Sequence, residues 1–411
     1  MDLSHKDITL EVTKKKLKCG SDTICMMPWE AMAVNMESNI RPCCRFNNKH
    51  SVSPEEYKES FKQLRIDMLN GKKDPRCTKC WEEEDSGVPS MRTRANIFHG
   101  LKFKKQHLTE NFRKLTHIEL SLDNTCNFQC RMCSSQYSSK LIKRDMWAVK
   151  EKPDIEFYVA KVQKSRYETL KDMDIDWDEL RSVKLLGGEP FMSPNFMDFL
   201  YFLDMRTDIS KVDLEIVTNC SKKMTQEMAD ILNDFRYIRL SGSFDGPKKI
   251  NEYQRVGSKW ENGLDNWLEY SEMLNNKRMV IHQTFTVLNV NHLDESLKLY
   301  EPHCDSISWS YDEYYLNFLC APDWFEEWIL KTNSNEKLKE IFKQKRVYDD
   351  EKWRRVMRTI YALDEFYGTN IEEANPELGK ILRIHNKKRV YNHTCDGDPN
   401  CFYCNMYKEV I

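Results

Sequence analysis

Six short apolar segments, separated by stretches long enough for a helix, run through residues 117–312 and constrain the fold more than any other feature. Each is rich in Val, Ile or Leu, which is typical of a buried strand. Strands that alternate with helical crossovers form a parallel sheet, so we expect an α/β fold whose sheet is open or curled into a partial barrel. Active sites in such sheets lie at the carboxyl ends of the strands. The predicted strands are His117–Asp123, Ser182–Gly188, Val212–Asn219, Tyr237–Asp245, Val280–Val290 and Ser306–Asp312.

The flanking regions differ from this pattern. Residues 1–100 show little periodicity beyond a predicted helix over 54–70 and a predicted loop over 71–84, which is typical of a small domain that a bound cluster holds together. Helical periodicity dominates 316–411, with helices expected in 322–330, 335–344 and 351–367. A chain of 411 residues fits two or three domains. We therefore expect units at 1–100, 116–315 and 316–411.

The charge balance excludes few partners. Lys and Arg number 63 against 65 Asp and Glu, so no global charge indicates a nucleic-acid or membrane partner. The first twenty residues lack the apolar core of a secretory signal, and no run of 18 apolar residues occurs. We expect a cytoplasmic protein without a membrane segment.

Fifteen cysteines are an excess for a chain that is too large to need disulfides. In a reducing compartment such a set indicates metal binding, redox chemistry or catalysis. Eleven of them are grouped along the sequence, which scattered core thiols would not be. The groups are Cys25, Cys43, Cys44, Cys77 and Cys80; Cys126, Cys130 and Cys133; and Cys395, Cys401 and Cys404.

The strongest motif is Cys126-Asn-Phe-Gln-Cys130-Arg-Met-Cys133, which follows the first predicted strand directly. Three thiolates in eight residues suit one face of an iron–sulfur cube, because soft sulfur ligands favour iron. Three protein ligands leave one iron open for a substrate or cofactor, as a catalytic metal site requires. The alternative is a zinc site, for which no good fourth ligand is adjacent.

The motif CxxxCxxC at this place resembles the signature of the radical S-adenosylmethionine (radical SAM) superfamily, whose fold is a partial (βα)6 barrel. The resemblance implies that Cys126, Cys130 and Cys133 bind a catalytic [4Fe–4S] cluster. It also implies SAM as cofactor and an external electron donor of the flavodoxin or ferredoxin type. In this superfamily SAM yields a 5′-deoxyadenosyl radical, which abstracts a hydrogen atom from a C–H bond.

Further motifs fall where this family has them, at the ends of later strands. Gly187-Gly188-Glu189-Pro190 resembles the turn that meets the methionyl amine of SAM, and glycines allow close backbone approach. Thr218-Asn219 resembles the family's TNG turn, with Cys220 where Gly is usual. Near Leu240–Gly246 the pattern resembles the SxDG strand end. The resemblance thus implies SAM contacts from Gly187, Gly188, Glu189, Pro190, Asn219, Ser243, Asp245 and Arg255, with Val287–Val290 near the adenine. For Arg255 a plain surface arginine is the competing interpretation.

The N-terminal cysteines resemble a subgroup of twitch-domain radical SAM proteins, relatives of the SPASM family. The matching segments are Cys25-Met-Met-Pro28-Trp29, the pair Cys43-Cys44, and Cys77-Thr-Lys-Cys80, which runs on to Gly87, Ser90 and Arg92. Ser38 stands where a turn glycine is usual. The resemblance implies a second, auxiliary [4Fe–4S] cluster on Cys25, Cys43, Cys77 and Cys80, and the spacing favours Cys43 over Cys44. Zinc on the same four ligands is the alternative.

The resemblance assigns no role to the three cysteines near the end of the sequence, Cys395, Cys401 and Cys404. They could bind zinc with His393 or Cys320, complete another cluster, or close over the active site. Three cysteines within ten residues are not expected to be idle core thiols.

The substrate is the open part of the prediction. Segment 331–394 carries 15 Lys and Arg against 10 Asp and Glu, a net +5, with Tyr348, Trp353 and Tyr391 between them, which is typical of phosphate tracking. The leading hypothesis is a radical SAM isomerase of phage type that acts on glycyl-modified thymine in DNA. A maturase of ribosomally made peptides is the alternative, and a zinc-stabilised nucleic-acid-binding protein is the non-enzymatic one.

Overall fold

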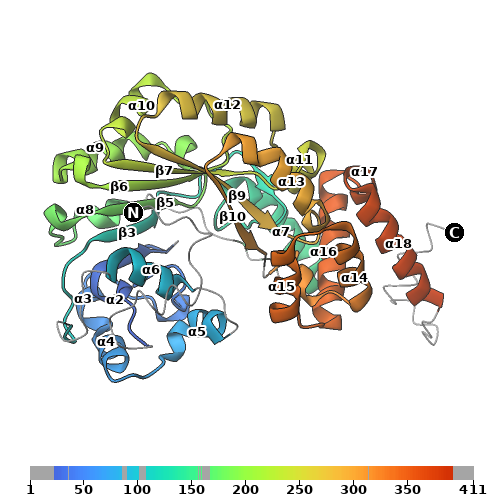
Figure 1. Ribbon diagram of the computed structural model, residues 1–411, viewed down its shortest axis with the longest axis horizontal. Helices are drawn as coiled ribbons and strands as arrows, with labels where there is room; N and C mark the ends of the chain where they lie inside the picture. Colours follow the sequence, from blue (N-terminus) through green and yellow to red (C-terminus); the bar gives the residue numbers. More distant parts are fainter. Residues whose placement is uncertain are drawn as a thin grey trace.

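The computed structural model describes residues 23–35, 37–85, 90–100, 108–155, 157, 159, 167–312 and 314–391. Figure 1 shows a central sheet with helices on its outer side, an N-terminal part against one edge, and a group of C-terminal helices beyond the strand ends. The fold is a mixed α/β architecture with a mainly parallel sheet, as the sequence predicts.

All six predicted strands are present in one sheet, and they pair in parallel. The strand order is β10-β9-β7-β6-β5-β3-β1-β2. Strand β9 ends at Phe285, earlier than expected, because the Asn289 side chain accepts from the Thr286 amide and closes a turn there. The six strands are β3 (His117–Ser121), β5 (Ser182–Leu186), β6 (Asp213–Thr218), β7 (Tyr237–Ser243), β9 (Lys277–Phe285) and β10 (Ser306–Tyr311).

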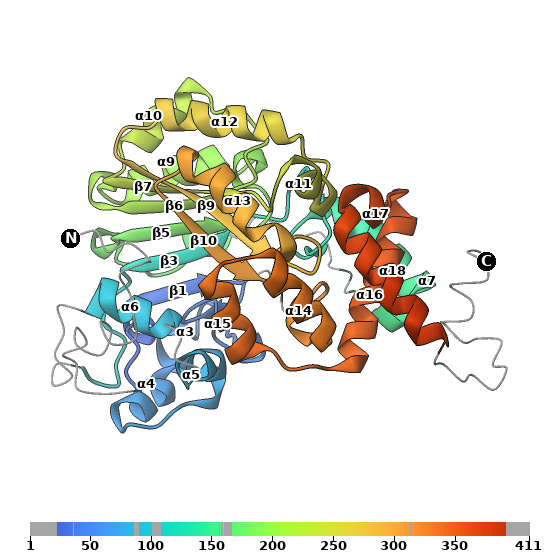
Figure 2. The same cartoon turned by 45° about the vertical axis from the view of Figure 1, so that its right-hand side comes forward.

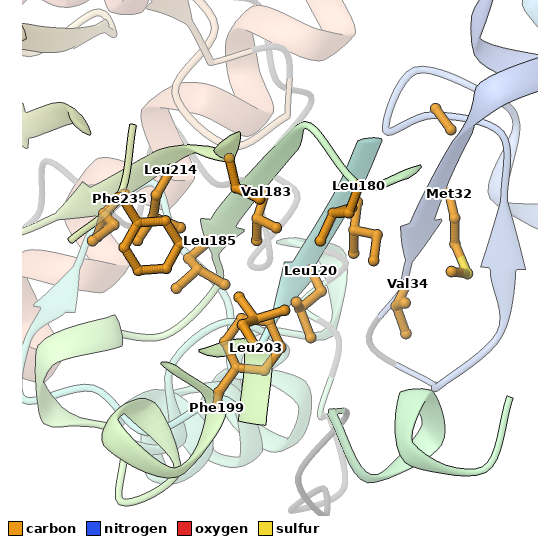
Figure 3. Close-up of a cluster of buried hydrophobic side chains, with 14 of the residues drawn as sticks. Met32, Val34, Leu120, Leu180, Val183, Leu185, Phe199, Leu203, Leu214 and Phe235 are labelled. Atoms are coloured by element: carbon orange, nitrogen blue, oxygen red, sulfur yellow. The ribbon is translucent and has the colours of Figure 1, made fainter. Parts of the chain in front are cut away.

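The apolar residues of these strands alternate, and one face of the sheet forms the main core. Val183 and Leu185 on β5 are fully buried, while Lys184 between them faces the other side. Figure 3 shows these side chains packed with Leu120 and with Phe199 and Leu203 of helix α9 (Phe196–Arg206). Burying large aliphatic and aromatic side chains stabilises the fold by about 1.5–3 kcal/mol each. Helices α10 (Gln226–Asn233) and α12 (Trp260–Met273) also flank the sheet (Figure 1).

The N-terminal region adds two strands to the same sheet. Strand β1 (Ala31–Val34) pairs in parallel with β3, and β2 (Ile40–Arg41) pairs antiparallel with β1. Five helices surround them, α2 (Met27–Glu30), α3 (Tyr57–Ser60), α4 (Lys62–Leu69), α5 (Thr78–Asp85) and α6 (Met91–Gly100).

Two predictions for this region need correction. The helix expected over 54–70 is broken at Phe61, whose ring is buried against Phe46 and Tyr57 and whose backbone leaves the helical conformation. The loop expected over 71–84 contains helix α5. Asp74 caps the turn that leads into α5, and its carbonyl accepts from the indole of the buried Trp81. Tertiary packing of Trp81 thus outweighs the turn-like composition of the segment.

The C-terminal helices are confirmed where the sequence predicts them. They are α14 (Asp323–Thr332), α15 (Glu336–Lys345) and α16 (Asp350–Tyr367), followed by α17 (Ile371–Ala374) and α18 (Pro376–Tyr391). Both Figure 1 and Figure 2 show them beyond the carboxyl ends of β9 and β10. None of the helices in the described ranges is both long and apolar enough to cross a membrane.

Candidate active site

The three cysteines of the CxxxCxxC motif lie in the loop after β3, at the carboxyl ends of the parallel strands. The loop begins at Asp123, whose side chain accepts from the Thr125 amide at 2.8 Å. Its middle forms the short strand β4 (Gln129–Cys130), which pairs antiparallel with β8 (Arg255–Val256) and places Arg255 beside Cys130. Cys126, Cys130 and Cys133 all line one cavity of about 960 Å³.

Two buried arginines hold this loop in place, and sequence analysis assigned neither a role. Arg144 donates to the carbonyls of Cys130 at 3.2 Å and Cys133 at 2.6 Å. Its counter-charge, Asp145, lies 2.6 Å away, and both side chains are fully buried. Arg131, inside the motif, donates to the Tyr253 carbonyl and to Asp364 of α16. The loop is thus fixed by charge-assisted hydrogen bonds from outside it.

The glycines of the GGEP turn are required by close approach to the cysteine loop. Gly187 has φ +84°, and a Cβ there would lie 2.1 Å from the Cβ of Ser121. A Cβ on Gly188 would lie 2.2 Å from the carbonyl oxygen of Thr125. The amide of Glu189 donates to the same oxygen at 2.6 Å. The turn and the first cysteine ligand position are therefore one rigid unit.

Glu189 is a fully buried carboxyl group on the cavity wall. It accepts from the Thr218 hydroxyl at 2.7 Å and from the amides of Asn219 at 2.5 Å and Phe191 at 3.2 Å. Burial raises the pKa of Glu189 to about 7, against these hydrogen bonds, which lower it. A carboxyl group with such a pKa can change its charge with a bound ligand.

Two further predicted residues, Asn219 and Ser243, line the cavity at the ends of β6 and β7. The Asn219 side chain donates to Asn127 at 3.0 Å and lies 3.9 Å from the Cys126 sulfur. Cys220, which replaces the usual glycine, adopts φ +59°. That left-handed conformation explains why a glycine is usual at this place.

Arg255 also lines the cavity, and its guanidinium lies 2.6 Å from the fully buried carboxylate of Asp245. Asp245 and Pro190 do not belong to the described residues that line the cavity. Val287–Val290 are buried in the apolar core of the C-terminal half and do not line it either. The structure therefore brings six of the eight predicted SAM contacts to one wall: Gly187, Gly188, Glu189, Asn219, Ser243 and Arg255.

Burial makes the thiols of the cysteine loop hard to ionise. Burial raises the pKa of Cys126, and burial likewise raises the pKa of Cys133 to about 12, with the neighbouring Cys126 adding to it. A metal cluster would offset this cost, because it binds thiolates directly.

A second group of thiols encloses a separate, smaller cavity in the N-terminal region. Its lining contains Cys25, Cys43, Cys77 and Cys80, the four predicted auxiliary ligands, around a space of about 20 Å³. Cys44 is not among the lining residues and lies near Glu119 and Lys184 instead. Four thiols around this small cavity contrast with three thiols on the large one.

The lining of the large cavity also contains aromatic and basic side chains. Trp309, Tyr311, Tyr314, Tyr315 and Phe318, from β10 and the segment after it, contribute the aromatic part. Arg45, Lys79 and Arg94 come from the N-terminal region. The aromatic run was visible in the sequence, but its place on the cavity was not.

The basic residues of segment 331–394, which were predicted to contact phosphates, include two that pair with carboxylates on α16. Arg354 pairs with Asp350 and Arg358 pairs with Glu351 on the exposed side of α16. These are surface ion pairs within one helix. Cys395, Cys401, Cys404 and His393 lie outside the described residues.

Comparison with known proteins agrees with the site. Residues 120–301 match the model of the Radical SAM superfamily. This range holds the cysteine loop, the GGEP turn and strands β5 to β9. The match supports a radical SAM enzyme, a superfamily for which a [4Fe–4S] cluster and SAM are the implied cofactors.

Curated relatives are similar over part of their length only. A radical SAM cyclopropyl synthase, TigE, of Paramaledivibacter caminithermalis is 28% identical over 154 residues, 36% of this chain and 31% of the relative. A GTP 3′,8-cyclase of Agrobacterium fabrum is 26% identical over 174 residues, 39% of this chain and 44% of the relative. The matches thus span less than half of the length of these relatives.

Solved structures give a weaker likeness. The structure of Streptococcus suis SuiB bound to its precursor peptide SuiA covers 80% of this chain and 65% of SuiB, at 15% identity and a TM-score of 0.32. Native anSMEcpe with bound AdoMet covers 62% of each chain, at 14% identity and a TM-score of 0.33. Scores this low say nothing about the substrate.

Proposed function

We propose that the 960 Å³ cavity is the site where this radical SAM enzyme abstracts hydrogen from a C–H bond of an amino-acid-type group. The observation that carries the proposal is that three cysteines and six polar or glycine positions of four strand ends line the same cavity. When bound, the cluster and SAM supply a 5′-deoxyadenosyl radical, and the protein positions the target carbon and excludes water.

Each predicted contact has a role in this proposal. Cys126, Cys130 and Cys133 hold the catalytic cluster and leave one iron for SAM. The backbone of Gly187 and Gly188 lets a ligand approach closely, and ionised Glu189 accepts from the SAM ammonium. Ser243, Asn219 and Arg255 provide polar contacts on the same wall. Asp245 pairs with Arg255, and Pro190 follows Glu189 in the turn.

An auxiliary [4Fe–4S] cluster on Cys25, Cys43, Cys77 and Cys80 is part of the proposal. Support comes from the four thiols around one closed cavity. Burial raises the pKa of Cys25, and the Cys80 and Cys77 thiols raise it further. Four neighbouring thiols, three of them buried, are costly as thiolates unless a metal cluster binds them. Arg92, which pairs with Glu84, lies against the same cavity and would offset the negative charge of such a cluster.

For the substrate we propose a nucleobase that carries an amino-acid group, with glycyl-modified thymine in DNA as the leading example and isomerisation as the reaction. The support is the aromatic and cationic lining of the cavity, since aromatic rings stack on bases and cations bind phosphate. Relatives whose name specifies GTP as substrate point in the same direction. The surface pairs of α16 add no support.

The test compares substrate classes directly. The anaerobically reconstituted, reduced enzyme is incubated with SAM and either glycyl-modified thymine DNA or candidate peptides. We expect 5′-deoxyadenosine release coupled to a change of the DNA nucleoside. Because an isomerisation leaves the mass unchanged, it is detected by the fragmentation pattern or the retention time of the nucleoside. Turnover confined to peptides would replace the DNA substrate by a peptide.

A further inference from the structure

The N-terminal region contributes a cationic wall to the active-site cavity. Arg45 precedes Phe46 in a turn, Lys79 lies on α5, and Arg94 lies on α6; all three line the 960 Å³ cavity. Lys79 reaches across to the segment after β10, where its ammonium lies 5.8 Å from the centre of the Tyr314 ring. The wall therefore belongs to the same chamber as the three cysteines.

The other charged groups on the cavity lining have partners in the described part of the chain. Arg45 pairs with Glu83 at 3.2 Å, and Arg255 pairs with Asp245. Asp312 accepts from the amides of Tyr314 and Leu316, both at 2.8 Å. Glu189, Lys79 and Glu340 have contacts too.

Arg94 differs from these groups. Within the described ranges its guanidinium has no hydrogen bond and no ion pair, although it is only partly exposed. Burial lowers the pKa of Arg94, and Glu83 opposes this while Arg45 adds to it. Because Glu83 already pairs with Arg45, Arg94 leaves this place with one positive charge in excess, which an anionic ligand would balance.

The neighbouring arginine shows what a structural role looks like on the same helix. Arg92 forms an ion pair with Glu84, donates to the Ile24 carbonyl at 2.9 Å, and lines the small cysteine cavity. Arg94 does none of this and lines the large cavity only. Its five donors are available to a ligand in the chamber.

We propose that Arg94, with Arg45 beside it, binds an anionic group of the substrate, a phosphate or a carboxylate, and so fixes the substrate against the N-terminal wall. This inference rests on the proposed function for the identity of the chamber. Arginine suits the task, because its planar fork binds both kinds of oxyanion in a bidentate manner. The aromatic side chains of Trp309, Tyr311 and Tyr315 would contact the flat part of the same substrate.

The test uses binding of small probes to the reconstituted full chain with SAM. Thymidine 5′-monophosphate tests the phosphate source, N-acetylglycine, a monoanion, tests the carboxylate source, and uncharged thymidine is the reference. We expect one anionic probe to bind more tightly than thymidine. Arg94→Gln should weaken that probe about tenfold or more without changing thymidine, because it removes a charge-assisted contact. Arg94→Lys should retain part of the affinity.

Controls separate this inference from a structural effect and from the proposed function. Arg181→Gln, before β5 at the opposite end of the strand, should leave probe affinity unchanged. Equal affinity of wild type and Arg94→Gln for both anionic probes would overturn the inference, and so would a shift of the auxiliary cluster's reduction potential without a change in probe binding. SAM cleavage by the wild type is measured on the same preparation. Its absence would sink the proposed function, whereas the probe data alone decide on Arg94.

Discussion

Arg131, in the middle of the CxxxCxxC motif, donates a 3.0 Å hydrogen bond to Asp364 of helix α16, a residue 233 positions later. The Arg131 side chain is fully buried, and its guanidinium also lies 3.8 Å from the centre of the Tyr253 ring. Asp364 in turn accepts from the Tyr253 hydroxyl at 2.8 Å and the Ile371 amide at 2.9 Å. The C-terminal helices therefore fix the loop that carries the three cysteines.

Asp364→Ala should destabilise the protein by about 3 kcal/mol, because it leaves the Arg131 charge buried without its partner. Urea unfolding of the cluster-loaded protein measures this. The matched control is Arg354→Gln, which removes the exposed pair with Asp350 and should cost about 0–1 kcal/mol. Equal losses in the two variants would contradict the role of Asp364.

The two adjacent cysteines of the N-terminal region should differ. Cys43→Ala should remove the auxiliary cluster, because Cys43 lines the closed cavity with Cys25, Cys77 and Cys80. Cys44→Ala should retain it, because Cys44 lies beside Glu119 and Lys184. Iron and sulfide analysis of both variants gives the answer. Loss of iron from Cys44→Ala alone would reverse the assignment.

Binding of SAM should depend on pH through Glu189. Its pKa is raised from 4.5 to about 7 by burial, so the carboxyl group is mainly protonated at about pH 6 and becomes ionised above pH 7. An ammonium ligand prefers the ionised form, so SAM affinity should rise from about pH 6 to 7.5. Glu189→Gln should bind SAM more weakly and remove this rise, with the cluster spectrum unchanged. A wild-type affinity that is flat over this range would exclude the contact.

The raised pKa of Glu189 should also make the free energy of unfolding depend on pH, and this free energy should fall where SAM affinity rises. An acid whose pKa is raised on folding stabilises the folded state below its unfolded value of 4.5, and that contribution is lost as pH rises through about 7. Glu189→Gln cannot ionise, so its free energy of unfolding should fall less than that of wild type over this pH range. Parallel pH profiles would show that Glu189 does not titrate there.

Ser38 should become more stable as glycine. It adopts φ +63°, a left-handed conformation that costs a residue with a Cβ about 1–2 kcal/mol, while the extra freedom of an unfolded glycine offsets about 0.5–1 kcal/mol. Ser38→Gly should therefore gain about 0.5–1 kcal/mol in urea unfolding. Ser38→Val, whose side chain is β-branched, should lose stability. A loss on Ser38→Gly would show that the hydroxyl matters more than the backbone.

Much of the parallel sheet was predictable, because each of its six strands from β3 to β10 carries its own apolar pattern. The short strand β1 was not, since its four residues, Ala31–Val34, are buried on both faces and show no alternation. Its place beside β3 depends on tertiary pairing, which no local pattern encodes.

The hydrogen bonds that hold the cysteine loop in place could not be predicted from the sequence, for a similar reason. The pairs of Arg131 with Asp364 and of Arg144 with the Cys130 carbonyl join segments through the fold and have no recognisable spacing. That Arg94 has no hydrogen bond or ion pair to the described residues through its guanidinium is likewise visible only in the folded chain. By contrast, Ser38 and Cys220, which the sequence had already revealed as departures from a glycine pattern, both keep the positive φ that glycine favours.

The most direct test of the account is replacement of Cys126, Cys130 and Cys133 together by Ala. The wild type, prepared without oxygen, should contain about eight irons from two [4Fe–4S] clusters. The variant should contain about half as much iron and release no 5′-deoxyadenosine from SAM on reduction, while its remaining iron depends on Cys43. SAM cleavage by the variant at the wild-type rate would contradict the assignment of the catalytic site.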